Sequence, residues 1–288
     1  MTEKAEKNYK FHNPLDTGEL LRQAVKKIGL YEWHRQKKKE IQREWRYESK
    51  FALHPALIFS KLIPWATGEN KEENKHRYLE LVINSMEKNE MAIGALGKRI
   101  TNYLNITQRL GYLFGTPIDF TLSWRMVIGL GASHPQETSM ALHHVYGIPY
   151  IPGSAVKGST RHWIIRDQFD GEEDKAMKNH DFKRVFGTPE QEGEVIFLDA
   201  YPIEKVNLKV DIMNPHYPDY YGKEKPPPPG DWQNPVPIKF LTIERTKFRF
   251  YLLGKEKTLI EKVKDWVEGA LKNYGIGAKT SSGYGYFE

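Results

Sequence analysis

The stretch KFRFYLLGKEKTLIEKVKDWVEGALKNYGIGAKTSSGYGYFE, residues 247–288, carries the strongest structural signal in the chain. Residues 247–254 are rich in aromatic and aliphatic side chains, which predicts a strand. Residues 255–275 then place apolar side chains on one face of an amphipathic helix, which Gly275 can end. Residues 283–288 predict a short final strand. The helix's apolar positions are Leu259, Ile260, Val263, Trp266, Val267, Ala270 and Leu271.

The same predicted order of strand, helix and strand occurs once before in the chain, between residues 116 and 203. TPIDFTLSWRMVIGLG, residues 116–131, alternates apolar and other side chains as a strand does. GSAVKGSTRHWIIRDQF, residues 153–169, predicts a helix capped by Ser154, and GEVIFLDAYPI, residues 193–203, predicts a second strand. An additional helical segment is expected at about 170–187. The order β-α-β-β-α-β predicts an α+β fold with a ferredoxin-like (RRM-like) core.

A long insertion, about residues 204–240, separates the second strand from the third. It contains eight of the chain's 17 prolines, including Pro226 to Pro229. Proline removes a backbone donor, so we expect neither a helix nor a central strand here. The aromatic residues Tyr217, Tyr220, Tyr221 and Trp232 argue against a purely solvated linker. The segment is therefore either disordered or an extended functional arm.

Residues 16–110 look helical by apolar periodicity, with helices expected at 16–29 and at about 72–110. RQKKKEIQREWR, residues 35–46, alternates basic and acidic side chains as a solvated helix would. We therefore divide the chain into a helical N-terminal extension, residues 1–115, and a core domain, residues 116–288, that carries the proline-rich insertion.

Composition excludes several classes of protein. The chain has no cysteine, so disulfides and thiolate metal sites are excluded. No apolar run approaches the roughly 20 residues that span a bilayer, and the N-terminus lacks a signal-peptide core, which predicts a cytoplasmic protein without a membrane partner. The net charge of +6 suggests a polyanionic partner. Residues 1–50 hold 13 Lys/Arg against 8 Asp/Glu, so most of the excess lies there.

Two glycine-containing segments are candidate anion sites. PGSAVKGSTR, residues 152–161, resembles a phosphate loop, but Lys157 precedes Gly158, so it is not a Walker motif. It leaves a helix N-terminus with hydroxyls and two cations, which attracts anions; an ordinary cap is the alternative. GIGAKTSSGYG, residues 275–285, is longer than the roughly 2–6 residues that usually connect a helix to a strand. In a ferredoxin-like fold both segments can line one surface. The candidate residues are Ser154, Lys157, Gly158, Ser159, Arg161, Gly277, Lys279, Thr280, Ser281 and Ser282.

No catalytic or metal constellation emerges from the sequence. The histidines lack the spacing of metal ligands, and no pair of carboxylates has a spacing that indicates acid–base catalysis. His144, near the first glycine segment, and Asp211, in the insertion, are the best-placed exceptions. We therefore expect no catalytic residue, no metal and no cofactor.

Five segments, taken in order, carry a family resemblance. They are GIPYIPGSAVKGSTR, FGTPEQEGEVIFLDAYP, DIMNPHYPDYYG, PVPIKFLTIE and GIGAKTSSGYG. Together they resemble the RAMP superfamily of CRISPR effector proteins, and within it the sixth-subunit family of the type III-B (Cmr) complexes. The resemblance covers about residues 116–288.

The resemblance implies a CRISPR-RNA-binding structural subunit of an RNA-targeting complex in antiviral defence, which caps the filament near the guide 3′ end. It implies guide and target RNA, backbone subunits of related fold and a small helical subunit as partners, with cleavage by a neighbouring subunit. It also implies that the insertion is a thumb between bases, formed by Asp211, Ile212, Met213, Asn214, His216 and Tyr217. A metal-independent CRISPR-RNA endoribonuclease of similar fold and a purely protein-binding scaffold remain alternatives.

Overall fold

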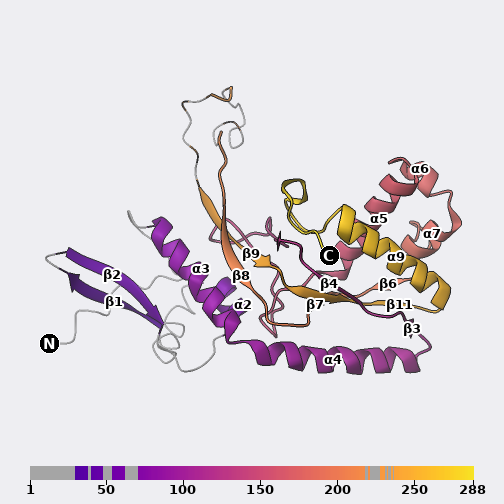
Figure 1. Ribbon diagram of the computed structural model, residues 1–288, viewed down its shortest axis with the longest axis horizontal. Helices are drawn as coiled ribbons and strands as arrows, with labels where there is room; N and C mark the ends of the chain where they lie inside the picture. Colours follow the sequence, from indigo (N-terminus) through magenta and orange to yellow (C-terminus); the bar gives the residue numbers. More distant parts are fainter. Residues whose placement is uncertain are drawn as a thin grey trace.

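The computed structural model describes residues 30–37, 40–47, 54–61, 71–217 and 237–288, with a few positions between 218 and 236. It is a mixed helix-and-sheet structure, as the predicted α+β class requires, and its sheets are antiparallel. In Figure 1 the helices α5 (Gly153–Gln168) and α9 (Lys257–Asn273) lie above the central strands, while α4 (Glu90–Arg109) runs along the opposite side.

The central strands are short and pair across long sequence separations. In one sheet β10 (Lys247–Phe250) lies between β4 (Ile118–Thr121) and β7 (Tyr201–Pro202). In another, β11 (Leu252–Gly254) lies between β3 (Leu113–Phe114) and β6 (Ile196–Phe197). The predicted strand at 247–254 is thus β10 followed by β11, and the one at 193–203 is β6 followed by β7.

The C-terminal residues pair with the outer side of β4, but through a bridge and not a regular strand. Leu122 forms an antiparallel bridge with Phe287, and Thr121 and Glu288 exchange backbone hydrogen bonds of 3.0 and 2.9 Å. The glycines at 283 and 285 have positive φ angles. A left-handed backbone does not continue a pleated strand, so only the end of the predicted strand 283–288 pairs in this way.

The helix α9 is the clearest confirmed element. All seven predicted apolar positions are buried, and the helix packs against α5. Gly275, with φ +78°, follows its end as expected. At Gly269 an added Cβ would lie 2.8 Å from the indole nitrogen of Trp163, so the missing side chain lets the two helices approach closely. Burying each large apolar side chain contributes roughly 1.5–3 kcal/mol, which makes this stripe a major part of the core.

The start of α5 corrects one prediction. Ser154 does not cap the helix; Pro152 occupies the N-cap position, and no side chain of that residue can accept a hydrogen bond. The backbone N–H of Gly153 instead donates to Asp199 Oδ1 at 2.7 Å. An added Cβ at Gly153 would lie 2.1 Å from the Phe197 carbonyl oxygen. The tight approach of residues 197–199 therefore replaces the local cap with a carboxylate from another segment.

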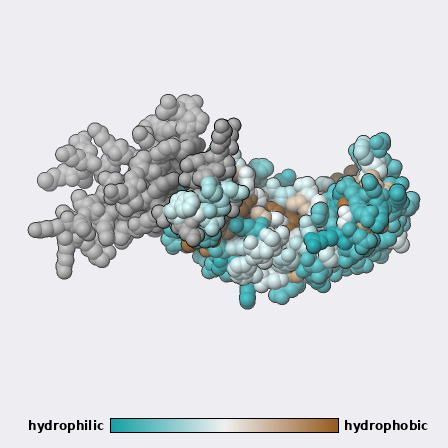
Figure 2. Space-filling model, turned by 90° about the horizontal axis from the view of Figure 1, so that it is seen from above, coloured by the Kyte–Doolittle hydropathy of each residue, from teal (hydrophilic) through white to brown (hydrophobic). Residues whose placement is uncertain are grey.

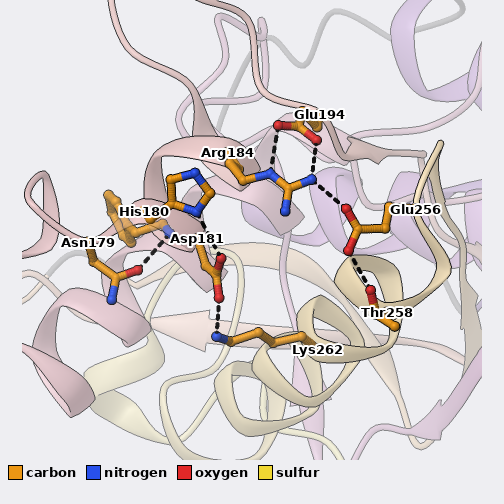
Figure 3. Close-up of polar contacts among 9 residues, drawn as sticks. Asn179, His180, Asp181, Arg184, Glu194, Glu256, Thr258 and Lys262 are labelled. Atoms are coloured by element: carbon orange, nitrogen blue, oxygen red, sulfur yellow. Dashed lines mark hydrogen bonds and ion pairs between the residues drawn. The ribbon is translucent and has the colours of Figure 1, made fainter.

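The helical segment expected at about 170–187 is confirmed as α6 (Glu173–Ala176) and α7 (His180–Phe186). Figure 3 shows how α7 is tied to the start of α9. Arg184 donates two hydrogen bonds to Glu194, at 2.8 and 2.6 Å, and a third to Glu256 at 2.6 Å. Lys262 donates to Asp181 at 2.6 Å. These exposed ion pairs set the orientation of α7 more than they add stability.

The N-terminal part is only partly helical. The helix predicted at 35–46 is wrong: β1 (Leu30–Lys37) and β2 (Glu40–Tyr47) form an antiparallel hairpin. Tyr31 and Trp33 alternate with polar residues, a period of two that the charge pattern obscured. The helix expected at about 72–110 is present as α3 (Lys71–Glu87) and α4, preceded by α2 (Pro55–Lys61). The helix predicted at 16–29 lies outside the described residues.

The proline-rich insertion begins and ends in a regular β-hairpin. Its first strand is at the edge of the sheet, but its last residues, from Ile238, enter the central strand, which corrects the expectation of no central strand here. β8 (Leu208–Met213) pairs antiparallel with β9 (Ile238–Glu244), which also pairs with β5 (Arg125–Met126). The hairpin projects from the middle of the molecule in Figure 1. The prolines begin only at Pro215, beyond the ladder, so the paired residues keep their backbone donors.

A polar network fixes the base of this hairpin to the core. The Arg125 guanidinium donates to Asp211 at 2.6 Å and to Glu244 at 3.0 Å. The Tyr284 hydroxyl donates to the same Asp211 carboxylate at 2.8 Å. Burial alone would raise the pKa of Asp211, but the hydrogen bonds from Tyr284 and Arg125 outweigh it and lower the pKa. Burial and the adjacent Asp211 carboxylate raise the pKa of Tyr284 to about 12.

Replacing Leu122 by alanine tests the packing of the core just after β4, where Leu122 bridges to Phe287. Leu122 is fully buried, so the Leu122→Ala variant should lose about 2–5 kcal/mol of unfolding free energy through lost transfer energy and a cavity. Leu110→Ala, at a side chain that is 69% exposed, is the control and should change it by less than about 0.5 kcal/mol. Urea unfolding of both variants gives the comparison, and equal losses would contradict the assignment of the core.

Removing the Tyr284 hydroxyl tests the hairpin attachment. Tyr284→Phe should lower the unfolding free energy by about 1 kcal/mol at pH 7, because Asp211 loses a donor. The stability from Asp211's lowered pKa is present above its unfolded pKa, about 3.9, and is lost as pH falls through the folded value. The deficit should therefore shrink in acid. Urea unfolding at pH 7 and pH 3 measures the difference. Tyr103→Phe, at an exposed tyrosine on α4, is the control. A loss of unfolding free energy in Tyr284→Phe that is the same at both pH values would refute the linkage to Asp211.

Candidate nucleic-acid interface

The two glycine segments meet in space, as the sequence predicts. The Ser159 hydroxyl, on α5, donates to the Gly275 carbonyl at 2.7 Å across 116 residues of chain. Beside this bond lies a cavity of about 620 Å³, here called the glycine-loop cavity. It brings Gly158 and Ser159 together with Gly277. Its lining residues are Ile128, Gly129, Leu130, Gly131, Pro152, Ala155, Gly158, Ser159, His162, Tyr274, Ile276, Gly277 and Ala278.

The C-terminal loop is held at this cavity by backbone contacts. The Ala278 N–H donates to the Val127 carbonyl at 2.9 Å, and the Gly285 N–H donates to the Arg125 carbonyl at 2.7 Å. Gly277 has φ +95°, and an added Cβ would lie 2.5 Å from the Val127 carbonyl oxygen. Only glycine satisfies both the left-handed backbone and this close approach. The loop therefore has one defined path along residues 125–128.

The cavity offers backbone donors without nearby carboxylates. Among the residues that the structure describes, none accepts a hydrogen bond from the backbone N–H groups of Gly129, Gly131 or Gly277. The residues that line the cavity include no Asp or Glu within that described part. Free backbone N–H groups in a glycine-rich turn bind anions. Seen from above in Figure 2, the described part of the molecule has hydrophobic surface near its middle, and its end at the right is mostly hydrophilic.

The other predicted cations and hydroxyls of α5 lie elsewhere. Ser154 and Lys157 line a second cavity of about 570 Å³, together with residues 186, 188–193 and 195–197. Glu190 and Glu192 belong to this lining, and Asp199 accepts a hydrogen bond from the first N–H of α5. These carboxylates compete with an incoming phosphate. The N-terminus of α5 is thus a weaker anion site than the sequence alone suggests.

Arg161 points toward the α6–α7 segment. Its guanidinium pairs with Glu173 at 2.5 Å and lies 5.4 Å from the centre of the Phe182 ring. Lys279 adopts a left-handed conformation, φ +63°, at the start of the 3₁₀ turn Thr280–Ser282. Its amino group lies 5.9 Å from the centre of the Phe240 ring on β9, and Ser281 and Ser282 are exposed. The ten predicted residues therefore divide among four places: the glycine-loop cavity, the second cavity, the α6–α7 side of α5, and the 3₁₀ turn with Lys279.

The six predicted thumb residues lie at the end of β8 and just beyond it. Asp211 is engaged by Arg125 and Tyr284, so it is not a free base. Ile212 is 51% exposed, whereas Met213 packs beside the small cluster of Val127, Phe240 and Tyr284. The other three residues, Asn214, His216 and Tyr217, follow the β8–β9 ladder. The ring centres of His216 and Tyr217 lie 6.4 Å apart.

The described histidines near the two glycine segments lie in different surroundings. His144 is exposed, its ring stacks on that of His143 with centroids 5.2 Å apart, and it is not among the residues that line the glycine-loop cavity. Burial, followed by the nearby His144 and Arg99, lowers the pKa of His143. His162, not His144, lines that cavity, beside Tyr274 at 5.1 Å. Within the described ranges no group of three or more His, Asp or Glu side chains could hold a metal ion.

Sequence reasoning missed the third wall of the cavity. Gly129, Leu130 and Gly131 are the last three residues of the stretch 116–131 that the sequence predicts as a strand, but no strand extends beyond Met126 there. The two glycines were the available signal that the strand ends early. Separately, no helix among the described residues combines the length and apolar character needed to cross a membrane.

Comparison with known proteins agrees with this geometry. A family model described as the RAMP superfamily matches residues 120–288. The CRISPR system Cmr subunit Cmr6 of Pyrococcus furiosus is 36% identical over 239 residues, covering 64% of this chain and 70% of that protein. The Cmr6 subunit of Saccharolobus solfataricus is 31% identical over 252 residues, covering 84% and 82%.

A solved structure is similar as well. It is described as the cryo-EM structure of the type III-B Cmr-beta bound to cognate target RNA, and one of its chains is 26% identical with a TM-score of 0.59. The match covers 79% of this chain and 77% of that chain. The glycine segments, the antiparallel sheets and these relatives lead to one conclusion: the chain belongs to the RAMP superfamily and, within it, to the Cmr6 family.

Proposed function

We propose that this protein is a CRISPR-RNA-binding structural subunit of a type III-B RNA-targeting complex in antiviral defence. The observation that carries the proposal is the glycine-loop cavity, in a chain of the Cmr6 family. Free backbone donors and small side chains suit a nucleic-acid backbone held without regard to sequence. The partners are guide RNA, target RNA and other Cmr subunits. The complex acts in the cytoplasm, where guide and target transcripts are both present.

We further infer that the central strands and helices α5 and α9 form a ferredoxin-like core. The pairings that support it place the C-terminal segment beside β4, β4 beside β10 and β10 beside β7. This is the strand order 4-1-3-2 for a chain that runs β-α-β-β-α-β. Residues 1–115 are an extension to this core, and helices α2 and α3 brace it through contacts of α3 with β8 and β9.

The β8–β9 hairpin and its proline-rich tip serve as a thumb that inserts between bases. Exposed Ile212 supports this, because apolar wedges unstack neighbouring bases. The network around Arg125 holds the base of the hairpin against the core, so β8 and β9 extend from a fixed support. The protein caps the filament near the 3′ end of the guide.

The protein has no catalytic role of its own. Asp211 is held by Arg125 and Tyr284, which keep it ionised and occupied, and His144 stacks on His143 outside the glycine-loop cavity. A general base must reach the attacking hydroxyl at roughly 3 Å. The Asp211 carboxylate is already engaged by two donors, and His144 is not among the residues that line the glycine-loop cavity. Target cleavage then belongs to a neighbouring subunit.

Substituting Gly158 by alanine tests the cavity. An added Cβ meets no heavy atom within 4 Å, so the fold tolerates it, and helix propensity should raise the unfolding free energy by about 0.5–1 kcal/mol. The same methyl group stands in the glycine-loop cavity, so the affinity of the assembled complex for guide RNA should fall roughly tenfold. Filter binding and urea unfolding measure the two effects.

The matched control for this experiment is Gly97→Ala. It also adds a Cβ without contacts to a helix, α4, but far from the cavity in sequence and outside its lining. It should raise stability and leave RNA affinity unchanged. If both variants bind guide RNA equally well, the cavity does not contact the RNA backbone.

Substitution of His144 by alanine and Asp211 by asparagine tests the absence of catalysis. Target RNA cleavage by the assembled complex should keep the number and positions of its cuts with either variant. Electrophoretic mapping of the cut sites, with assembly checked by size-exclusion chromatography, is the measurement. Loss of one cut at intact assembly and RNA affinity would favour the endoribonuclease alternative instead.

A further inference from the structure

One exposed aromatic side chain is unexplained by the fold and by the glycine-loop cavity. Trp124 is 42% exposed, although it lies between two paired segments, β4 and β5. The small cluster beside it consists of Val127, Phe240 and Tyr284, with Leu130, Met213 and Ala278 packed against it, and does not include Trp124. The indole therefore contributes little to the core, and its position needs another reason.

The backbone around Trp124 is pinned from two sides. Its carbonyl accepts a hydrogen bond from the Arg245 N–H at 2.9 Å, at the turn between β9 and β10. The preceding Ser123 N–H donates to the Tyr286 carbonyl at 3.0 Å, in the C-terminal segment. Arg245 has φ +39°, so this turn holds a strained backbone to make the contact. The side chain thus projects from a fixed point.

The indole ring is supported by groups that are themselves held in place. Its centre lies 4.9 Å from that of the Tyr284 ring, at an interplanar angle of 47°, and the Arg125 guanidinium lies 5.5 Å from it. Tyr284 is 8% exposed and donates its hydroxyl to Asp211, which also pairs with Arg125. An exposed aromatic ring on such a support loses little conformational freedom when a flat ligand stacks on it.

We propose that Trp124 is a stacking platform for one unpaired base of the RNA that the complex carries. The proposal rests on the proposed RNA-binding function and adds a site to it. Stacking accepts every base, since each has a π-face, which suits a subunit that must hold guides of any sequence. Exposed Arg245 adjoins Trp124 through the backbone. The Lys279 amino group lies 5.9 Å from the centre of the Phe240 ring, and that ring lies 6.3 Å from the ring of Tyr284, which contacts the indole. Cations beside an aromatic platform are the pattern of single-strand binding surfaces.

The position connects the two proposed RNA contacts. Tyr284, beneath the indole, belongs to the C-terminal loop that lines the glycine-loop cavity through Gly277. Arg125, beside the indole, is paired with Asp211 at the base of the β8–β9 hairpin. A base that leaves the stack at the foot of the thumb would meet Trp124 while its backbone passes the cavity.

The test uses the complete complex, reconstituted with guide RNA and this chain as wild type, Trp124→Ala or Trp124→Phe. Trp124→Ala should weaken guide or target binding by about 5- to 150-fold, the range for losing one stacked base, and Trp124→Phe should restore most of it. The slope of affinity against salt should stay unchanged, because no phosphate contact is removed. Tyr103→Ala, a 47% exposed aromatic on α4, is the matched control and should bind normally.

Abasic nucleotides identify the base and its strand. Two sets of RNAs, one of guides and one of targets, each carry a single abasic nucleotide at successive positions. At one position in one of the two sets, the abasic nucleotide should weaken RNA binding by the complex that carries the wild-type chain. The same abasic nucleotide should cause no further loss of affinity in the complex that carries Trp124→Ala. Non-additivity at that position is the expected result, and additivity at every position in both sets overturns the proposal.

The remaining outcomes are separable. If Trp124→Ala binds normally while Gly158→Ala binds weakly, the platform is wrong and the RNA-binding function stands. If neither variant nor any abasic position changes affinity, both proposals fail. If Trp124→Ala loses a protein subunit at unchanged RNA affinity, the surface docks protein and the platform is overturned. Thermal unfolding of the isolated variants should match the wild type, and a lower melting temperature for Trp124→Ala would assign the ring to the core instead.

Discussion

The backbone pairing of residues 121–127 with the C-terminal segment holds the rest of this structure in place. Thr121, Ser123 and Arg125 meet Glu288, Tyr286 and Gly285, and the Val127 carbonyl accepts from the Ala278 N–H. Because these hydrogen bonds follow one extended stretch, they fix the path of the glycine loop without help from its side chains. The loop can then be built of small residues, which leave room for a ligand.

The same stretch also anchors the hairpin that we propose as a thumb. Arg125 pairs with Asp211 and Glu244, one on each hairpin strand, and Tyr284 returns from the C-terminal segment to the same Asp211. A partly buried carboxylate with two charged or polar donors is costly to leave unpaired, so the three elements stay together. The proposed cavity, the proposed thumb and Trp124 thus share one rigid support.

Carboxylates explain why we propose the glycine-loop cavity, and not the N-terminus of α5, as the anion site. Asp199 occupies the first N–H of α5, and Glu190 and Glu192 lie in the cavity of Lys157. In the C-terminal loop the backbone donors face no such competitor within the described lining. A low net charge outside the N-terminal fifty residues is therefore compatible with RNA binding, because the field that matters is local.

The sequence by itself determined the elements whose signal is periodic and local: the buried stripe of α9, the strands at 247–254, and the meeting of Gly158 with Gly277 through the expected topology. It misled where local patterns compete, as at 35–46, where charge alternation hid a strand period, and at Ser154, where a local cap was expected. Only the tertiary structure decided that Asp199 caps α5, that Arg161 turns to Glu173 and that Asp211 is engaged. Those partners lie 12 to 86 residues away in the chain, and side chains at such separations meet only when the elements that carry them have packed together.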